Sequence, residues 1–402
     1  MERPPNISRR RLWFMRISVV CAPAVALILL EGLLRVAGAF APTPADMRVE
    51  FEAGTVFFPE WDAEIAMPKP EGTGRIFVLG GSSAMGFGVE APFSELIQRD
   101  LPGEWEVING GVVAYGSHRV LEVLRRAREF KPDAIVLYFG HNEFLEDVFY
   151  DPDGVVAKAE SLGRLGRRLH LVNCARSFIG PPKTPMRPKL QRHFVANTQF
   201  PLIHSDAEFA VRLQLVEANL RQMIGECWDA GIKLLVLPAV TNLLAPPGDY
   251  VQHSPEWQAR VDRAQENLDQ QNWGLAATVL KDAHRLDDQH ALSHYLLGLA
   301  ELGRGQMDAA QRTLLMANQL DARGDRNNPR LTEAILAVCQ EEGGPAVDVG
   351  PIFYAQLSAE FAAMQNGKRG RLFLDHCHPS EEGHRLIAEA ILPLLRALSG
   401  YE

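Results

Sequence analysis

The 402-residue sequence predicts an α/β fold in which helices cover both faces of a parallel β-sheet. Two observations predict it. Short apolar runs of the kind found in buried parallel strands alternate with segments of helical spacing, and glycine-rich or polar clusters follow the runs. Two further segments lie outside this alternation. They predict an N-terminal transmembrane helix and a small all-α insertion.

Apolar runs of four to seven residues are the predicted strands, at 75–79, 106–109, 134–139, 232–238 and 346–349. Segments with apolar residues at helical spacing are the predicted helices, at 117–130, 207–230 and 381–398. Pro132 separates the first helix from a strand, and Gly231 ends the second helix. Because active residues of such sheets lie beyond the carboxyl ends of the strands, we expect the chemistry there.

The N-terminus predicts a membrane anchor. A cluster of arginines precedes an uncharged apolar run at 17–30, and the stretch 12–40 is long enough to cross a bilayer. Arginines on its N-terminal side predict a cytoplasmic N-terminus and an extracytoplasmic catalytic domain, on the periplasmic or outer face. Two alternatives stay open: cleavage as a signal peptide at residues 37–39, and a buried amphipathic helix of a soluble protein.

A basic, loop-rich segment is predicted at 151–200. It holds nine Lys or Arg, three Asp or Glu and five prolines, with little periodicity. Such a segment suits a lid, a contact with the membrane surface or a groove for an anionic substrate. A solvated excursion of the chain is an equal alternative.

The insertion is predicted from an internal repeat of 34 residues. Six positions that begin at Trp273 recur from Met307, with small residues where helices would cross. This period resembles tetratricopeptide repeats. Two units cannot form an independent solenoid, so they must pack on the main domain. A groove for a protein partner and a packed helical appendage are both open interpretations.

The composition excludes several classes of function. A net charge of −9 gives no reason to expect a nucleic-acid partner. The five cysteines are far apart, so no zinc-like spacing occurs, although disulfides are open in an exported domain. No Gly-Lys-Ser/Thr follows the first glycine turn, which argues against a nucleotide site.

Four polar motifs supply the parts of a serine hydrolase. They are Gly80-Gly81-Ser82-Ser83 after the first strand, the stretch 109–117 after the second, Gly140-His141-Asn142-Glu143 after the third, and Asp375-His376-Cys377-His378 before the last helix. A serine nucleophile needs a base, an orienting acid and donors for the oxyanion. Each motif alone is weak evidence for a serine hydrolase, but all four in this order along the chain are strong evidence.

With these motifs the chain resembles SGNH/GDSL hydrolases, in particular bacterial membrane-anchored members with tetratricopeptide-like helices. The resemblance implies a flavodoxin-like three-layer α/β/α fold, with no cofactor and no metal. It implies that Ser82 is the nucleophile, that His378 is the general base and that Asp375 orients this histidine. It further implies that the Asn142 side chain and the Ala114 backbone amide donate to the oxyanion.

Two positions depart from the family pattern. Gly81 stands where the family has an aspartate, and Ala114 stands where it has a glycine, with Gly111 as a competing alignment. Since position 114 supplies a backbone amide, alanine should serve if its dihedral angles are allowed. A purely structural interpretation is open for Ser82 and Asp375, because both residue types commonly cap helices.

Three other histidines, in the motifs or in the last helix, are expected to be structural or to contact substrate. These are His141, His376 and His384. A metal site built from Asp375, His376 and His378 is conceivable, but it lacks a fourth ligand.

The sequence thus predicts a membrane-anchored serine esterase that hydrolyses O-acyl esters, such as O-acetyl esters, of a small molecule or glycan through an acyl-enzyme. An O-acyltransferase of an envelope or exported glycan is the first alternative, because it shares that intermediate. A weakly active scaffold that binds partners through its repeats is the second. The predicted domains are an anchor (1–45), a first hydrolase part (46–250), a helical insertion (251–330) and a second hydrolase part (331–402).

Overall fold

The computed structural model describes residues 65–145, 203, 205–248, 254–368 and 370–399, together with positions 27, 30, 32 and 33. From residue 65 onward these belong to one compact unit. The basic segment at 151–200 lies outside the described residues, as does the anchor at 12–40 apart from those four positions. Among the residues described, no helix combines the length and the apolar character needed to cross a membrane.

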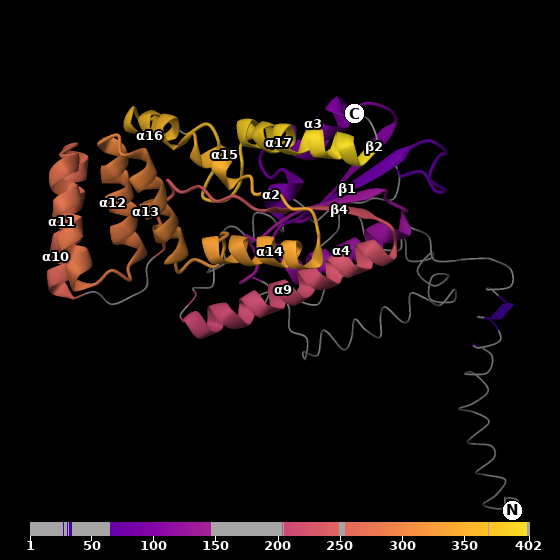
Figure 1. The fold of residues 1–402 in the computed structure, drawn as a ribbon, viewed down its shortest axis with the longest axis horizontal. Helices are drawn as coiled ribbons and strands as arrows, with labels where there is room; N and C mark the ends of the chain where they lie inside the picture. Colours follow the sequence, from indigo (N-terminus) through magenta and orange to yellow (C-terminus); the bar gives the residue numbers. More distant parts are fainter. Residues whose placement is uncertain are drawn as a thin grey trace, which may run out of the picture. The chain divides into compact units, whose positions relative to one another are not determined.

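A parallel sheet with the order β2-β1-β3-β4 forms the centre of the fold (Figure 1). Its strands are β1 (Gly74–Gly80), β2 (Trp105–Gly111), β3 (Ala134–Phe139) and β4 (Lys233–Pro238). Val78 of β1 is paired with Asn109 on one side and with Val136 on the other. All side chains of β3 are buried, as expected for a parallel strand covered on both faces. The prediction of a parallel α/β sheet is therefore confirmed.

The fifth predicted strand, 346–349, is wrong in extent. Ala346 forms one isolated parallel bridge with Val236, supported by a hydrogen bond from Val347 N to Val236 O of 2.9 Å. The pairing stops because the chain turns directly into helix α15 (Gly350–Tyr354). The Asp348 carboxylate accepts from Gly350 N at 2.8 Å and so fixes that turn.

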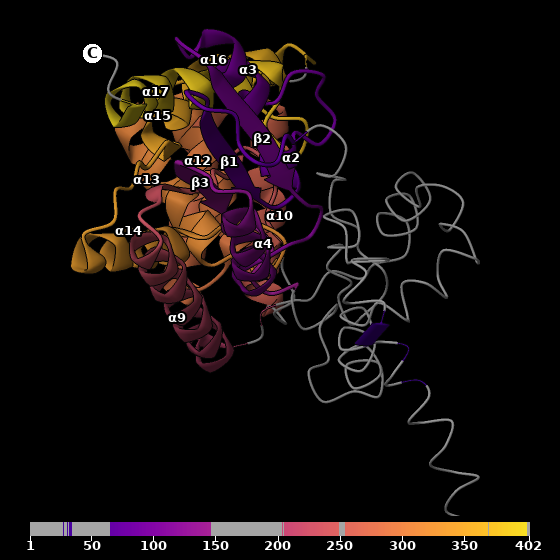
Figure 2. The same cartoon turned by 90° about the vertical axis from the view of Figure 1, so that its right-hand side faces the viewer.

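Helices lie on both faces of the sheet (Figures 1 and 2). On one face are α4 (Ser117–Glu129), α9 (Asp206–Asp229) and α14 (Pro329–Glu342); on the other are α3 (Phe93–Asp100) and α17 (Glu381–Ser399). The helices predicted at 117–130, 207–230 and 381–398 are confirmed. The core beneath α3 and α17 is apolar, and Phe93 meets the Tyr138 ring edge-on at 5.6 Å.

The repeat region folds as two helix pairs. These are α10 (Pro255–Asp269) with α11 (Trp273–Leu286), and α12 (Ala291–Gly303) with α13 (Met307–Gln319). The first residues of α11 and α13 are the two positions from which the 34-residue repeat begins. Gly298 lies at a crossing, because a Cβ there would meet the Leu314 side chain at 2.6 Å.

The helix pairs share a hydrophobic core with the rest of the unit. That core extends to Leu243 and Leu244 after β4 and to helix α16 (Leu357–Gln365), where Trp273 meets the Phe361 ring at 5.8 Å. This is the packing on the main domain that two repeats require. The likeness to tetratricopeptide repeats stays a prediction.

Candidate active site

The predicted site residues lie on loops at the carboxyl edge of the sheet. Ser82 follows β1 and is the first residue of the short helix α2 (Ser82–Met85). Ala114 follows β2, and Asn142 follows β3. A separate turn at 375–378, just before α17, supplies the acid and the base. The edge is the one at which open α/β sheets place their ligands.

Ser82, His378 and Asp375 form a continuous hydrogen-bonded chain. The Ser82 Oγ lies 2.8 Å from His378 Nε2, and His378 Nδ1 lies 2.7 Å from Asp375 Oδ2. Since an ionised carboxylate can only accept, Nδ1 carries a proton and Nε2 is left free to accept the serine proton. This is the geometry of an activated serine nucleophile.

Asp375 is held in its ionised form. Its second oxygen, Oδ1, accepts from the backbone amides of Cys377 at 2.9 Å and His378 at 2.8 Å. Burial opposes ionisation, but the hydrogen bond and charge of His378, together with these amides, hold the pKa of Asp375 well below its ordinary value. Asp375 is therefore ionised at neutral pH and accepts a hydrogen bond from the base.

The turn that carries Ser82 requires glycine before it. Gly80 has a φ of 158°, and a Cβ on it would overlap the Tyr138 carbonyl oxygen of β3. Close approach of β1 to β3 therefore demands glycine where the strand ends. Behind the nucleophile, Ser83 Oγ donates to Cys377 O at 2.9 Å and so ties this turn to the base-bearing turn.

Asn142 lies directly beside the nucleophile turn. Its Nδ2 donates to Tyr115 O at 3.0 Å, and a Cβ on Gly81 would overlap that same nitrogen. The space that a side chain at position 81 would fill is thus taken by the Asn142 amide. With Asn142 in this position, a side chain at position 81 would displace its amide.

Ala114 adopts a backbone conformation that favours glycine. Its φ is 64°, in the left-handed region, and Arg119 donates to its carbonyl oxygen. Gly111 needs glycine for another reason, because a Cβ there would overlap the backbone of Met85 in α2. Both positions therefore favour glycine, position 114 through its backbone conformation and position 111 through the lack of space for a side chain.

His141 of the third motif and His384 of α17 are outside the Ser82–His378–Asp375 chain. His141 is buried, accepts from Asn327 N at 2.9 Å, and burial together with the nearby His378 and His376 lowers its pKa to about 3. His384 accepts from Phe93 N at 3.2 Å, and burial lowers its pKa to about 4. Both act as neutral acceptors at neutral pH.

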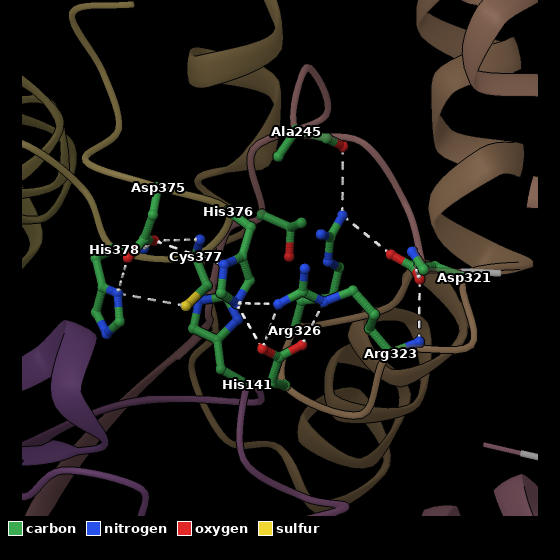
Figure 3. Close-up of polar contacts among 12 residues, drawn as sticks. His141, Ala245, Asp321, Arg323, Arg326, Asp375, His376, Cys377 and His378 are labelled. Carbon is green, nitrogen blue, oxygen red and sulfur yellow. Dashed lines mark hydrogen bonds and ion pairs between the residues drawn. The ribbon is translucent and has the colours of Figure 1, made fainter. Parts of the chain in front are cut away.

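Polar residues that the motifs do not contain lie beside the turn at 375–378; Arg323, for example, lies next to His376 (Figure 3). Asn242 Nδ2 donates to Asp375 O and Asn242 N donates to His376 O, each at 3.0 Å. The His376 Nε2 lies 2.9 Å from Asp325 Oδ2. Nothing in the sequence indicated Asn242 or Asp325, because each comes from a loop far from any motif.

One group of possible metal ligands was found among the described residues: Asp375, His376 and Cys377, with ligand atoms within 4.8 Å of one another. Both Asp375 oxygens already accept hydrogen bonds. Burial raises the pKa of the Cys377 thiol well above its ordinary value, so it is a poor ligand at neutral pH. These donors fit a hydrogen-bonded turn better than a metal centre.

A cavity of about 400 Å³ opens beside Asp375, at the acid end of the hydrogen-bonded chain of Ser82, His378 and Asp375. Asp375 and His376 line one side, and Arg323, Arg326 and Lys368 contribute positive charge. Leu244, Met364 and Phe373 are among its apolar residues. Its volume and mixed lining are those of a site for a small ligand.

Comparison with known proteins gives structural matches alone. No family model matches the chain, and no curated protein does. Solved structures that match include TesA (14% identity, 81% of this chain and 99% of that chain, TM-score 0.33) and a mutant of Axe2, an acetyl-xylooligosaccharide esterase from Geobacillus Stearmophilus (12%, 80% and 93%, 0.37). A third is a member of the lipolytic protein G-D-S-L family from Veillonella parvula (12%, 80% and 97%, 0.35). At these low identities and TM-scores, what those proteins act on is not transferred to this chain.

Proposed function

We propose that this chain is a serine ester hydrolase with Ser82 as its nucleophile. The observation that carries the proposal is the hydrogen-bonded chain from Ser82 through His378 to Asp375, with distances of 2.8 and 2.7 Å. The three residues come from two loops that are 293 positions apart in sequence, so local capping does not explain their meeting. A helix cap would need only a neighbouring amide.

The reaction follows from the geometry. Ser82 Oγ attacks the acyl carbonyl while His378 Nε2 takes its proton, and Asp375 stabilises the imidazolium at Nδ1. His378 then returns the proton to the departing alkoxide, which leaves an acyl group on Ser82. Water, deprotonated by the same histidine, attacks this ester and releases the acid and the free serine.

The negative charge on the carbonyl oxygen needs donors during both steps. We assign this role to the Asn142 side-chain amide and to the backbone amides of Ser82 and Ala114. Asn142 is buried next to the nucleophile turn, and the left-handed backbone of Ala114 is fixed through its carbonyl. Donors held in place before the reaction cost no reorganisation during it.

The substrate is proposed to be an O-acyl ester, such as an O-acetyl group on a glycan, and the site of action to be extracytoplasmic. The basic and then apolar N-terminus supports the location. The O-acyltransferase alternative stays open, because both reactions pass through the same acyl-enzyme on Ser82. An assay of acyl transfer from p-nitrophenyl acetate to added sugars distinguishes the esterase from the transferase. If the acyl group passes only to water, the transferase alternative is ruled out.

Labelling by a fluorophosphonate tests the proposal directly. The wild type is expected to form a covalent adduct at Ser82, located by peptide mass spectrometry, and to hydrolyse p-nitrophenyl acetate. Ser82→Ala and His378→Ala should lose hydrolysis by about 10³-fold or more. Ser358→Ala, at an exposed serine of α16, is the matched control and should behave as the wild type. A folded wild type that is neither labelled nor active contradicts the proposed function and favours the scaffold alternative.

A further inference from the structure

The loop that leaves the helical insertion, residues 321–328, is buried against the catalytic edge. Its polar residues Asp321, Asp325, Arg326, Asn327 and Asn328 are all at most 6% exposed. Burying polar groups is costly unless they are bonded, so the partners of this loop show what it supports.

Asp325 connects this loop to the turn that carries the base. Its Oδ2 lies 2.9 Å from His376 Nε2, and both of its oxygens accept from Arg323, at 2.9 and 2.6 Å. Burial opposes its ionisation, but His376 and Arg323 hold the pKa of Asp325 well below its ordinary value. Because a carboxylate only accepts, His376 donates its Nε2 proton to Asp325.

His376 lies inside the catalytic turn, directly after the triad acid. Its Nδ1 is 4.0 Å from Asp375 Oδ1, the oxygen that accepts from the backbone amides of Cys377 and His378. Asp325 therefore fixes the residue next to Asp375 from outside the turn. The turn has no regular secondary structure between Asp375 and Cys377, so bonds of this kind decide where it lies.

Asn327 connects the same loop to the loop that carries Asn142. Its backbone N donates to His141 Nδ1 at 2.9 Å, and its backbone O accepts from Thr241 Oγ1 at 2.9 Å. A Cβ on Gly140 would meet the Asn327 side chain at 3.1 Å, so this side chain packs against the Gly140 backbone. One loop thus touches both the oxyanion motif and the base motif.

We propose that this exit loop holds the catalytic edge in its working geometry, with Asp325 and His376 as positioning residues for the Asp375–His378 pair. The inference rests on the proposed function. A base must be held within a fraction of an ångström of its productive position, and short side chains on a loop do not provide this alone. The helical insertion is then a structural part of the catalytic machinery, since α13 leads directly into the loop that orients the base.

Two substitutions of His376 separate positioning from simple packing. His376→Gln keeps a donor at the end of a side chain of similar reach, whereas His376→Leu keeps the volume and removes the donor. We expect His376→Leu to lower the rate of fluorophosphonate labelling and kcat by about tenfold, with KM unchanged. His376→Gln should stay within about threefold of the wild type, because it still donates to Asp325.

A double-mutant cycle assigns the effect to the pair. Asp325→Asn alone should slow labelling in the same way as His376→Leu, and the double variant should be no slower than His376→Leu. The His378 Nδ1 proton, observed by NMR without turnover, should shift in His376→Leu and stay unchanged in His376→Gln. Asp282→Asn, which breaks an exposed ion pair with Arg285 on α11, is the control and should stay within about twofold of the wild type.

The outcomes separate the two proposals. Slow labelling in His376→Leu with rescue in His376→Gln supports positioning, provided that thermal unfolding shows both variants folded. Equal rates in all three proteins, or equal loss in both variants, overturn it. A folded wild type that is not labelled contradicts the proposed function instead, and an Nδ1 proton signal that His376→Leu leaves unmoved still contradicts the positioning role.

Discussion

Replacing Gly81 by alanine should damage catalysis although it leaves the triad itself intact. Gly81 has a φ of −84°, which any residue adopts, so the backbone does not require glycine there. A Cβ at this position, however, would overlap Asn142 Nδ2 and lie 3.2 Å from Tyr115 O. Both neighbours are buried, so they have little space to retreat. The Asn142 amide would have to move away from the nucleophile.

The magnitude follows from the role proposed for Asn142. Removing one oxyanion donor costs about 10²- to 10³-fold in kcat, or roughly 3–4 kcal/mol of transition-state stabilisation. We expect Gly81→Ala to lose about that much, with little change in KM for p-nitrophenyl acetate. Gly81→Asp, which introduces the aspartate that the family has at this position, should also lower kcat.

The assay compares kcat, KM and unfolding temperature for Gly81→Ala, Asn142→Ala and the double variant. If glycine acts through the asparagine, the double variant should be no slower than Asn142→Ala. Gly225→Ala on α9 is the control, since a Cβ there meets nothing within 4 Å. A folded Gly81→Ala enzyme that keeps its kcat within about twofold would refute the reasoning.

Further outcomes follow from single positions. Ala114→Gly should keep activity and raise the free energy of unfolding by up to about 1 kcal/mol, because it relieves a left-handed alanine, and a loss of stability in urea titrations would contradict that conformation. His384→Gln should reduce the loss in the free energy of unfolding that accompanies a fall in pH from 7 to 4. Burial lowers the pKa of His384 to about 4, below the value of about 6.5 in an unfolded chain. The stabilisation from neutral His384 is therefore complete above about pH 6.5. As the pH falls from there toward 4, the free energy of unfolding decreases by up to about 1.4 kcal/mol per pH unit. Urea titrations between pH 7 and 4 measure the slope, and equal slopes in both proteins would show that His384 protonates in the fold. Arg326→Met should cost about 3–5 kcal/mol in the same titrations, because it leaves Asp321 buried without its ion-pair partner at 3.0 Å; a cost below about 1 kcal/mol would mean that water reaches Asp321.

The sequence was sufficient to predict the helices and strands whose pattern of apolar residues is local along the chain. Strand and helix patterns predicted β1, β3, β4, α4, α9 and α17 within one or two residues, because each buries a regular face. The prediction of the fifth strand was wrong in extent. A four-residue apolar run does not reveal that the chain turns at Asp348 and Gly350 and enters a helix. Edge pairing depends on the partner strand as well as on the run itself.

For the site, the motifs named Ser82, Asn142, Asp375 and His378 because their order along the chain is distinctive. The distances that make them a chemical unit belong to the tertiary structure, as does the close contact between Gly81 and the Asn142 amide. Asp325 has no motif at all. Its role exists only because α13 ends where the chain returns to the catalytic edge.

The sequence by itself therefore determined the type of fold, the candidate residues and their order, since these follow from periodicity and residue chemistry. The tertiary structure alone decided which side chains meet. Hydrogen bonds act over about 3 Å, and no pattern along a chain records such distances between residues hundreds of positions apart. That is why the nucleophile was visible from the start, while the loop that orients its base was not.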